Sequence, residues 1–204
     1  MENIIKFVQN EMKNDKTGHD FNHALRVVNN AKKIMQQEGG NEKIIITACF
    51  IHDTIDEKLF ENVKIQINKI ITLLKEEQYS SNEIEEIIFI ITNMSFHKQI
   101  KNDNLNFQIV QDADKLDALG SIGIIRTIQY GTTKSRLFYE EENLKNVNGK
   151  LFFNKSTETT LSHFYDKLLK LPMLMNTKTG KSIALKRVLI MNDFLDNFYQ
   201  ELEN

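Results

Sequence analysis

Residues 44–53 read IIITACFIHD, an apolar run that ends in an adjacent histidine and aspartate. A run of this length without polar alternation is either a buried helix or a buried strand. Ala48 and Cys49 within the run, and helical periodicity on both sides of it, favour the buried helix. The stretch therefore predicts an α-helical protein whose core helix carries His52 and Asp53 at its last turn.

The segments on either side of this run repeat the helical spacing. Apolar residues recur at three- and four-residue steps, which is the pattern of a helix with one buried face. Further helices are predicted over residues 4–12, 24–35, 63–77, 84–91, 106–130, 157–171 and 182–202. Gly39-Gly40 is a normal helix stop, and Ser80 with Glu83 forms a capping box. Residues 106–130 form either one helix or two helices broken near Gly120-Ser121.

Residues 131–156 differ from the rest of the chain because they are polar and rich in turn formers. Asn148-Gly149 between apolar residues indicates either a short hairpin or an ordered loop. Residues 131–149 have two interpretations, a lid over a phosphate chain or a plain surface loop. The chain shows no internal repeat, low-complexity tract or linker. We therefore predict one all-α domain over residues 1–204 with this single irregular excursion.

Composition excludes several classes of protein. The 204 residues include 26 Lys and Arg against 28 Asp and Glu, a net charge of −2, without the basic excess of a nucleic-acid binder. The single cysteine, Cys49, excludes an intramolecular disulfide and a multi-cysteine zinc ribbon, and it favours a reducing compartment. No signal peptide is recognisable, and no apolar run approaches the roughly 20 residues that span a bilayer. We expect a cytoplasmic protein that binds no polymeric nucleic acid and no membrane.

Ionisable residues interrupt the apolar pattern at three places. His23 shares a helical face with Val27; taken alone, it is more simply explained as a core histidine bonded to a backbone carbonyl. His52-Asp53 directly follows the core helix, where both side chains can converge on one ion. A buried, unpaired carboxylate costs several kcal/mol, so Asp53 requires a partner.

The third place is Asp112-Ala113-Asp114. In a helix the two aspartates are about 200° apart and cannot both point at one centre. Asp114 lies beside the buried face marked by Ile109, Ala113 and Leu116. Carboxylates this close together repel one another unless a cation is present.

The three places together supply two imidazoles and two carboxylates from three helices. This mixed nitrogen and oxygen set suits Mn²⁺, Fe²⁺, Co²⁺, Ni²⁺ or Zn²⁺ better than Ca²⁺. Four protein ligands leave open positions on a six-coordinate ion, which is the condition for catalysis.

With these residues in this order, the sequence resembles the HD-domain metal-dependent phosphohydrolases, which are named after the His-Asp pair. The resemblance implies His23, His52, Asp53 and Asp114 as metal ligands and leaves the earlier pair His19-Asp20 outside the site. Asp112 remains the alternative for the last ligand, with Asp114 behind it. The fold implied is an HD-type helical bundle with a metal-binding core at about residues 20–130 and C-terminal helices, residues 157–203, packing on it.

The resemblance extends over nearly the whole chain to a small stand-alone bacterial branch associated with nucleotide pyrophosphohydrolase-type activity. The segments that carry it are residues 21–27, 52–58, 93–96, 111–118, 126–131, 163–168 and 175–180. It implies a divalent metal, Mn²⁺ first and Fe, Co, Ni, Zn or Mg as alternatives, and a small phosphorylated substrate, a nucleotide. A homodimer is also open.

We expect Asp56 and Asp112 to take part in catalysis, Asp56 by orienting a ligand or relaying the proton of the attacking water. The candidate phosphate partners are Arg26, Lys58, Lys115 and Arg136, because a phosphate chain needs several cations near the metal. Lys115 is the first of these because it adjoins Asp114. We expect His97 on the surface and His163 in the core or behind the ligands.

Three other enzymatic functions and one non-enzymatic function compete with this interpretation. The chain could be a nucleoside monophosphate phosphatase or another HD phosphodiesterase. A non-catalytic metal- or nucleotide-binding HD module would not need all four ligands. A di-iron oxygenase would need further histidine ligands, and none is obviously placed.

Overall fold

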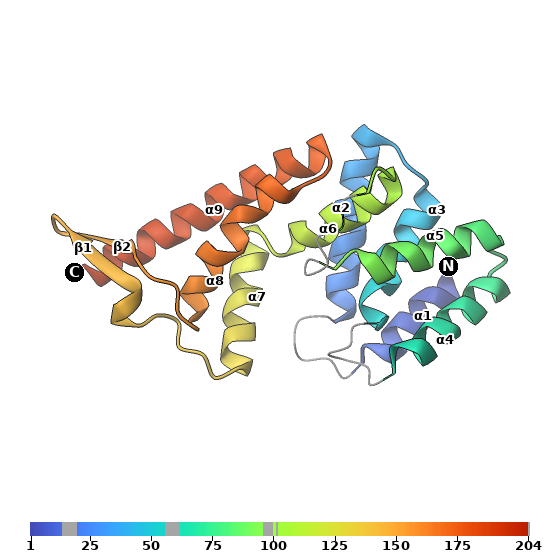
Figure 1. Ribbon diagram of the computed structural model, residues 1–204, viewed down its shortest axis with the longest axis horizontal. Helices are drawn as coiled ribbons and strands as arrows, with labels where there is room; N and C mark the ends of the chain where they lie inside the picture. Colours follow the sequence, from blue (N-terminus) through green and yellow to red (C-terminus); the bar gives the residue numbers. More distant parts are fainter. Residues whose placement is uncertain (14–19, 56–61, 96–99, 101, 204) are drawn as a thin grey trace. The chain divides into compact units, whose positions relative to one another are not determined.

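The computed structural model describes residues 1–204 except 14–19, 56–61, 96–99, 101 and 204. Helices dominate this described part, and its sheet has two strands (Figure 1). The prediction of an all-α protein is confirmed. The α-helices are α1 (Glu2–Glu11), α2 (Phe21–Glu38), α3 (Glu42–Ile51), α4 (Val63–Glu76), α5 (Ser81–Asn93), α6 (Leu105–Asp117), α7 (Gly120–Thr133), α8 (Thr160–Asp166) and α9 (Lys178–Leu202).

The chain divides into two compact units, Met1–Asp114 and Lys115–Asn204. The boundary falls inside α6, directly after Asp114. The interpretation of the whole chain as one domain stays a prediction.

The apolar run at residues 44–51 is the centre of the first unit. It forms α3, every residue from Ile44 to Ile51 is buried, and α1, α2 and α5 pack around it. The choice of a buried helix over a strand is confirmed. Because α3 is surrounded on all sides, its C-terminal end brings His52 into the interior.

Helix ends in this unit follow the capping signals. The Asp20 carboxylate accepts a hydrogen bond from the backbone N–H of His23 at 2.9 Å and starts α2. Gly39, with φ 81°, ends α2, and Ser80 and Glu83 form the capping box of α5. Asp20 of the pair His19-Asp20 therefore has a structural role, because it is the N-cap of α2.

The segment 106–130 forms two helices. Ile109, Ala113 and Leu116 are fully buried on α6, as the apolar spacing predicted. Gly120 begins α7 with φ 74°, a conformation that glycine adopts without strain. A Cβ atom at Gly120 would also lie 3.2 Å from the side chain of Arg187.

In the second unit, residues 144–153 form a hairpin. Strand β1 (Leu144–Val147) pairs antiparallel with β2 (Lys150–Phe153) across Asn148-Gly149, both of which have positive φ. Such a turn matches the twist of the two strands. Of the two alternatives, the hairpin is therefore confirmed and the ordered loop is not. A short 3₁₀ helix, η3 (Glu141–Asn143), precedes β1.

The last two predicted helices differ from the structure at their ends. Only α8 is α-helical within 157–171, and a 3₁₀ helix, η4 (Leu168–Leu174), follows it and contains Pro172, which has no N–H to donate. Helix α9 begins four residues before the predicted start, because the Thr177 hydroxyl caps it by accepting from the N–H of Gly180 at 3.0 Å.

A largely buried group of neutral polar side chains joins η3 to residues 157–162 in the second unit, and we call it the Asn143 cluster. It consists of Asn143, Thr157, Thr159 and Ser162. The Asn143 amide donates to Thr157 Oγ1 at 2.6 Å and to the Lys155 carbonyl at 2.9 Å, while its oxygen accepts from Thr159 Oγ1 at 3.0 Å. Each of these contacts pairs a donor with an acceptor.

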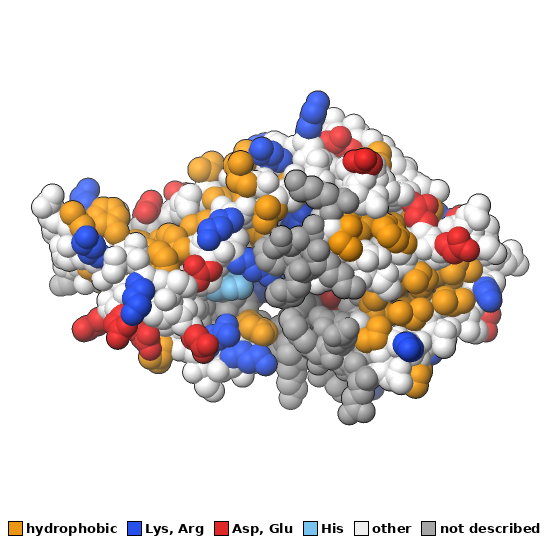
Figure 2. Space-filling view, viewed as in Figure 1, with side chains coloured by type: hydrophobic (Ala, Val, Ile, Leu, Met, Phe, Trp, Pro, Cys, Tyr) orange, Lys and Arg blue, Asp and Glu red, His pale blue; other side chains and the backbone are white. Residues whose placement is uncertain are grey.

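Figure 2 shows basic, acidic and hydrophobic side chains scattered over the face that it draws. None of the described helices combines the length and the apolar character that crossing a membrane requires.

Candidate metal centre

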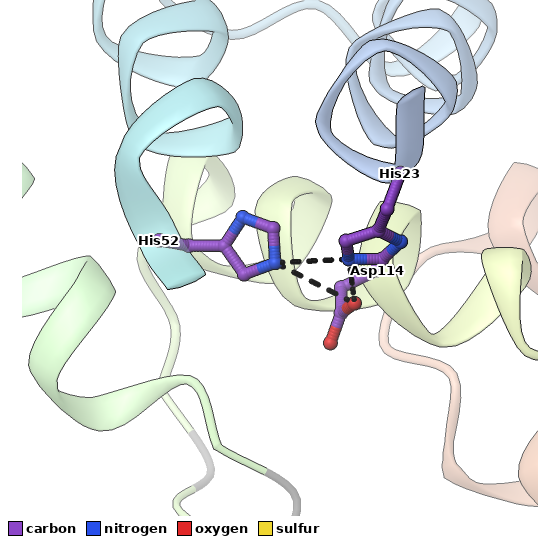
Figure 3. A group of neighbouring side chains, drawn as sticks. All are labelled: His23, His52 and Asp114. Carbon is purple, nitrogen blue, oxygen red and sulfur yellow. Dashed lines mark hydrogen bonds and ion pairs between the residues drawn. The ribbon is translucent and has the colours of Figure 1, made fainter. Parts of the chain in front are cut away.

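Three separate elements bring the predicted ligands together in the first unit (Figure 3). His23 lies in the first turn of α2, where the Asp20 cap fixes the start of the helix. His52 is the residue at which α3 passes into the 3₁₀ helix η1 (His52–Ile55), and Asp53 follows it. Asp114 comes from α6.

The donor atoms of these residues face one another. The Nε2 atoms of His23 and His52 are 3.3 Å apart, and Asp114 Oδ1 lies 3.4 Å from the first and 3.7 Å from the second. Asp53 places Oδ2 3.2 Å from His23 Nε2 and Oδ1 3.2 Å from His52 Nε2. The ligand atoms of His23, His52 and Asp114 all lie within 4.8 Å of one another.

These separations agree with the size of a divalent ion. Bonds of about 2.1 Å to nitrogen and oxygen place neighbouring ligand atoms about 3–4 Å apart around one ion. Both imidazoles and Asp53 are buried, whereas the Asp114 side chain is 38% exposed. The donor set therefore fits a divalent ion and is not sealed from solvent.

The main chain of α3 orients the His52 ring. Its Nδ1 lies 2.9 Å from the carbonyl oxygen of Cys49. A carbonyl can only accept, so Nδ1 carries the proton and Nε2 is directed at the centre. Metal-binding histidines are commonly held in this way by a carbonyl on the other ring nitrogen.

The electrostatics of the centre show the same convergence. Desolvation of the Asp114 carboxylate by the surrounding protein would raise its pKa, but hydrogen bonds with His23 and His52 hold that pKa well below its usual range. Burial would lower the pKa of His52, yet Asp53 and Asp114 raise it well above its usual value. Without an ion, the two carboxylates therefore favour the positively charged form of the His52 imidazole.

The remaining candidates are distributed differently. Asp112 is fully buried on α6 and has a partner of its own. Arg26 is half-buried on α2 and also has a partner. The Lys115 ammonium donates to the carbonyl of Leu174 at 2.7 Å in the second unit. Asp56, Lys58, His19 and His97 lie outside the described residues.

Arg136 has a neighbour that the sequence interpretation did not connect with it. Burial lowers the pKa of His163 on α8, and the positive charges of Lys167 and Arg136 lower it further. The four-residue spacing of His163 and Lys167 could have suggested a shared helix face. Nothing local in the sequence links either of them to Arg136, which is exposed beyond the end of α7.

Comparisons with known proteins agree with this geometry. A family model described as HD domain matches residues 20–119, the span that holds His23, His52, Asp53 and Asp114. The protein YpgQ of Bacillus subtilis is 31% identical over 99% of this chain and 91% of its own length. The chain belongs to the HD-domain family. The prediction of a metal-dependent phosphohydrolase is thereby confirmed at the level of the family.

Two solved structures are similar to this protein along nearly the whole chain. A structure of Bacillus subtilis YpgQ in complex with ADP has a TM-score of 0.80 and 28% identity, covering 98% of this chain and 96% of that one. An HD-superfamily hydrolase from Bacillus thuringiensis has a TM-score of 0.80 and 36% identity, covering 98% of this chain and 95% of that one.

Proposed function

We propose that this HD-domain protein hydrolyses a phosphoester or phosphoanhydride of a small nucleotide, with a divalent metal held by His23, His52, Asp53 and Asp114. The observation that carries the proposal is the convergence of these four side chains. Carboxylate oxygens of Asp53 and Asp114 lie 3.2–3.7 Å from the Nε2 atoms of the two histidines. The ADP complex of YpgQ supports a nucleotide as the substrate class. The first reaction to test is the release of pyrophosphate from a (deoxy)nucleoside triphosphate.

The residues in and around the centre have different tasks in this proposal. His52 is oriented by the Cys49 carbonyl, and Asp53 offers one oxygen toward each imidazole. Such an ion, when bound, lowers the pKa of a coordinated water and offsets negative charge on the phosphoryl oxygens. We assign the handling of the water's proton to Asp56 or Asp112. Mn²⁺ is the first ion to test, since mixed imidazole and carboxylate ligands suit it.

Arg26 is the first phosphate partner to replace. It lies three residues after His23 on α2, and a guanidinium binds phosphate oxygens through two parallel hydrogen bonds. Lys58, Lys115 and Arg136 follow, and the Lys115 ammonium donates to the Leu174 carbonyl.

Metal analysis of the purified protein, followed by a product assay with nucleoside tri-, di- and monophosphates, tests the proposal. We expect Mn²⁺-stimulated turnover that chelation stops. Pyrophosphate as the product supports the pyrophosphohydrolase, whereas free phosphate from a monophosphate identifies a nucleotidase. Metal binding without turnover of any nucleotide or phosphodiester would leave the non-catalytic binding module.

A further inference from the structure

Asn30 is a buried amide on a face of α2 that also carries buried apolar side chains. It lies on α2 among Val27, Ala31 and Ile34, which are fully buried. Its Nδ2 donates to the main-chain carbonyl of Ala113 on α6 at 3.0 Å. A buried amide needs its hydrogen bonds, so this contact restricts how α2 and α6 can pack.

Each end of this hydrogen bond lies on a helix that carries a candidate metal ligand. Asn30 follows His23 by seven residues, which places it about 20° around α2 and about 10.5 Å along its axis. Ala113 directly precedes Asp114. The same face of α2 therefore carries the candidate ligand His23 and the Asn30 amide. This amide binds α6 at Ala113, the residue directly before the candidate ligand Asp114.

Asp114 is the donor that most needs such a contact. His52 and Asp53 are adjacent in the chain, and the Cys49 carbonyl orients His52 from within the same helix. Asp114 arrives from a helix that is distant in sequence, and apolar packing alone is non-directional. A buried hydrogen bond in a low-dielectric interior selects one register between two helices.

We infer that Asn30 is a positioning residue, whose bond to the Ala113 carbonyl sets α6 against α2 so that Asp114 Oδ1 lies 3.4 Å from His23 Nε2. The inference rests on the proposed metal centre. It assigns to Asn30 no contact with the ion or the substrate.

The test uses Co²⁺ as the probe, because its visible absorption reports the ligand geometry independently of activity. In Asn30→Leu we expect Co²⁺ to bind about 10–100-fold more weakly, the loss typical of residues that orient metal ligands. The Co²⁺ absorption bands change as well, and kcat falls more than KM rises. Asn30→Ala is the second variant, in case leucine does not fit beside the Ala113 carbonyl.

Thr47→Val is the matched control. It removes the buried hydrogen bond of 2.7 Å between Thr47 and Tyr79 in the same unit while nearly keeping the shape of the side chain. We expect it to lower the melting temperature of the metal-free protein and to leave the Co²⁺ affinity and spectrum unchanged.

Two results would overturn the inference. One is an unchanged Co²⁺ affinity and spectrum in a folded Asn30 variant, and the other is a loss of affinity in Thr47→Val in proportion to its loss of stability. Failure of the wild-type protein to bind Co²⁺ would overturn both the inference and the metal centre. Co²⁺ binding without nucleotide turnover would overturn the proposed substrate alone. The Co²⁺ affinity and absorption bands of the Asn30 variants would still decide the role of Asn30.

Discussion

Each unit buries a group of polar side chains, but the two groups differ in how their hydrogen-bonding atoms match. In the Asn143 cluster, amide and hydroxyl donors meet carbonyl and hydroxyl acceptors, and all of the side chains are neutral. In the metal centre, two carboxylates and two Nε2 atoms converge, so four acceptors face one another unless an imidazole is protonated. A matched cluster stabilises a fold, whereas converging acceptors require a cation.

The largest effect is expected when one of the converging acceptors in the metal centre is removed. We expect His52→Ala to weaken divalent-metal binding by more than about 100-fold, beyond the usual loss for residues that only orient ligands, and to abolish turnover. Metal content and nucleotide hydrolysis measure the two effects. His163→Ala, which replaces a histidine of the second unit, is the control and should keep its metal. Full metal content in His52→Ala would disprove the assignment of the centre.

The demand for a cation can also be measured as stability. If the folded centre alone binds Mn²⁺, the ion at 100 times its dissociation constant should stabilise the protein by about 2.7 kcal/mol. Calorimetry with and without a chelator checks this value. The stabilisation should vanish in Asp53→Asn, and an equal effect of Mn²⁺ on that variant would place the ion elsewhere.

The matched cluster should respond in the opposite way. Asn143→Ala leaves buried partners of the amide without their hydrogen bonds, which costs about 1–3 kcal/mol of stability. Denaturant unfolding measures the loss, and Mn²⁺ titration should give the wild-type affinity. A weakened Mn²⁺ affinity in this variant would show that the two groups are not independent.

The smallest effect concerns a matched pair of charges on the surface of the first unit. Hydrogen bonds from Lys43, then from Ser80, lower the pKa of Glu83 to about 2. Because the folded pKa lies below the unfolded value, the carboxylate stabilises the protein above the unfolded pKa, and this contribution disappears as the pH falls toward 2. Glu83→Gln should therefore melt slightly lower than the wild type at neutral pH, and the difference should close near pH 2. A difference independent of pH would assign the effect to the capping geometry alone.

The sequence predicted the features that depend on neighbouring residues. The apolar run at 44–51 predicted a buried helix, and Asn148-Gly149 indicated a hairpin or an ordered loop, of which the structure has the hairpin. The position of Asp114 beside the buried face of α6 agrees with its place beside the two imidazoles. The helix and the hairpin needed only helical periodicity and turn chemistry, whereas the choice of Asp114 as a ligand also rested on the resemblance to the HD family.

Features that depend on distant residues could not be predicted in this way. The bond from Asn30 to Ala113 joins residues that are 83 positions apart, and Lys115 reaches Leu174 across 59. No periodicity in either segment identifies the other partner. The Thr177 cap, which starts α9 at Lys178, was a local signal that the sequence interpretation overlooked.

The one cysteine of the chain makes α3 observable without an engineered label. Cys49 is fully buried, one turn before His52, and burial raises the pKa of its thiol, so the reactive thiolate does not form in the closed protein. A thiol reagent can therefore modify the chain only in molecules in which α3 has opened. The rate at which the reagent modifies Cys49 therefore measures the local opening of the helix that holds His52. A metal that binds at the end of this helix should lower that rate.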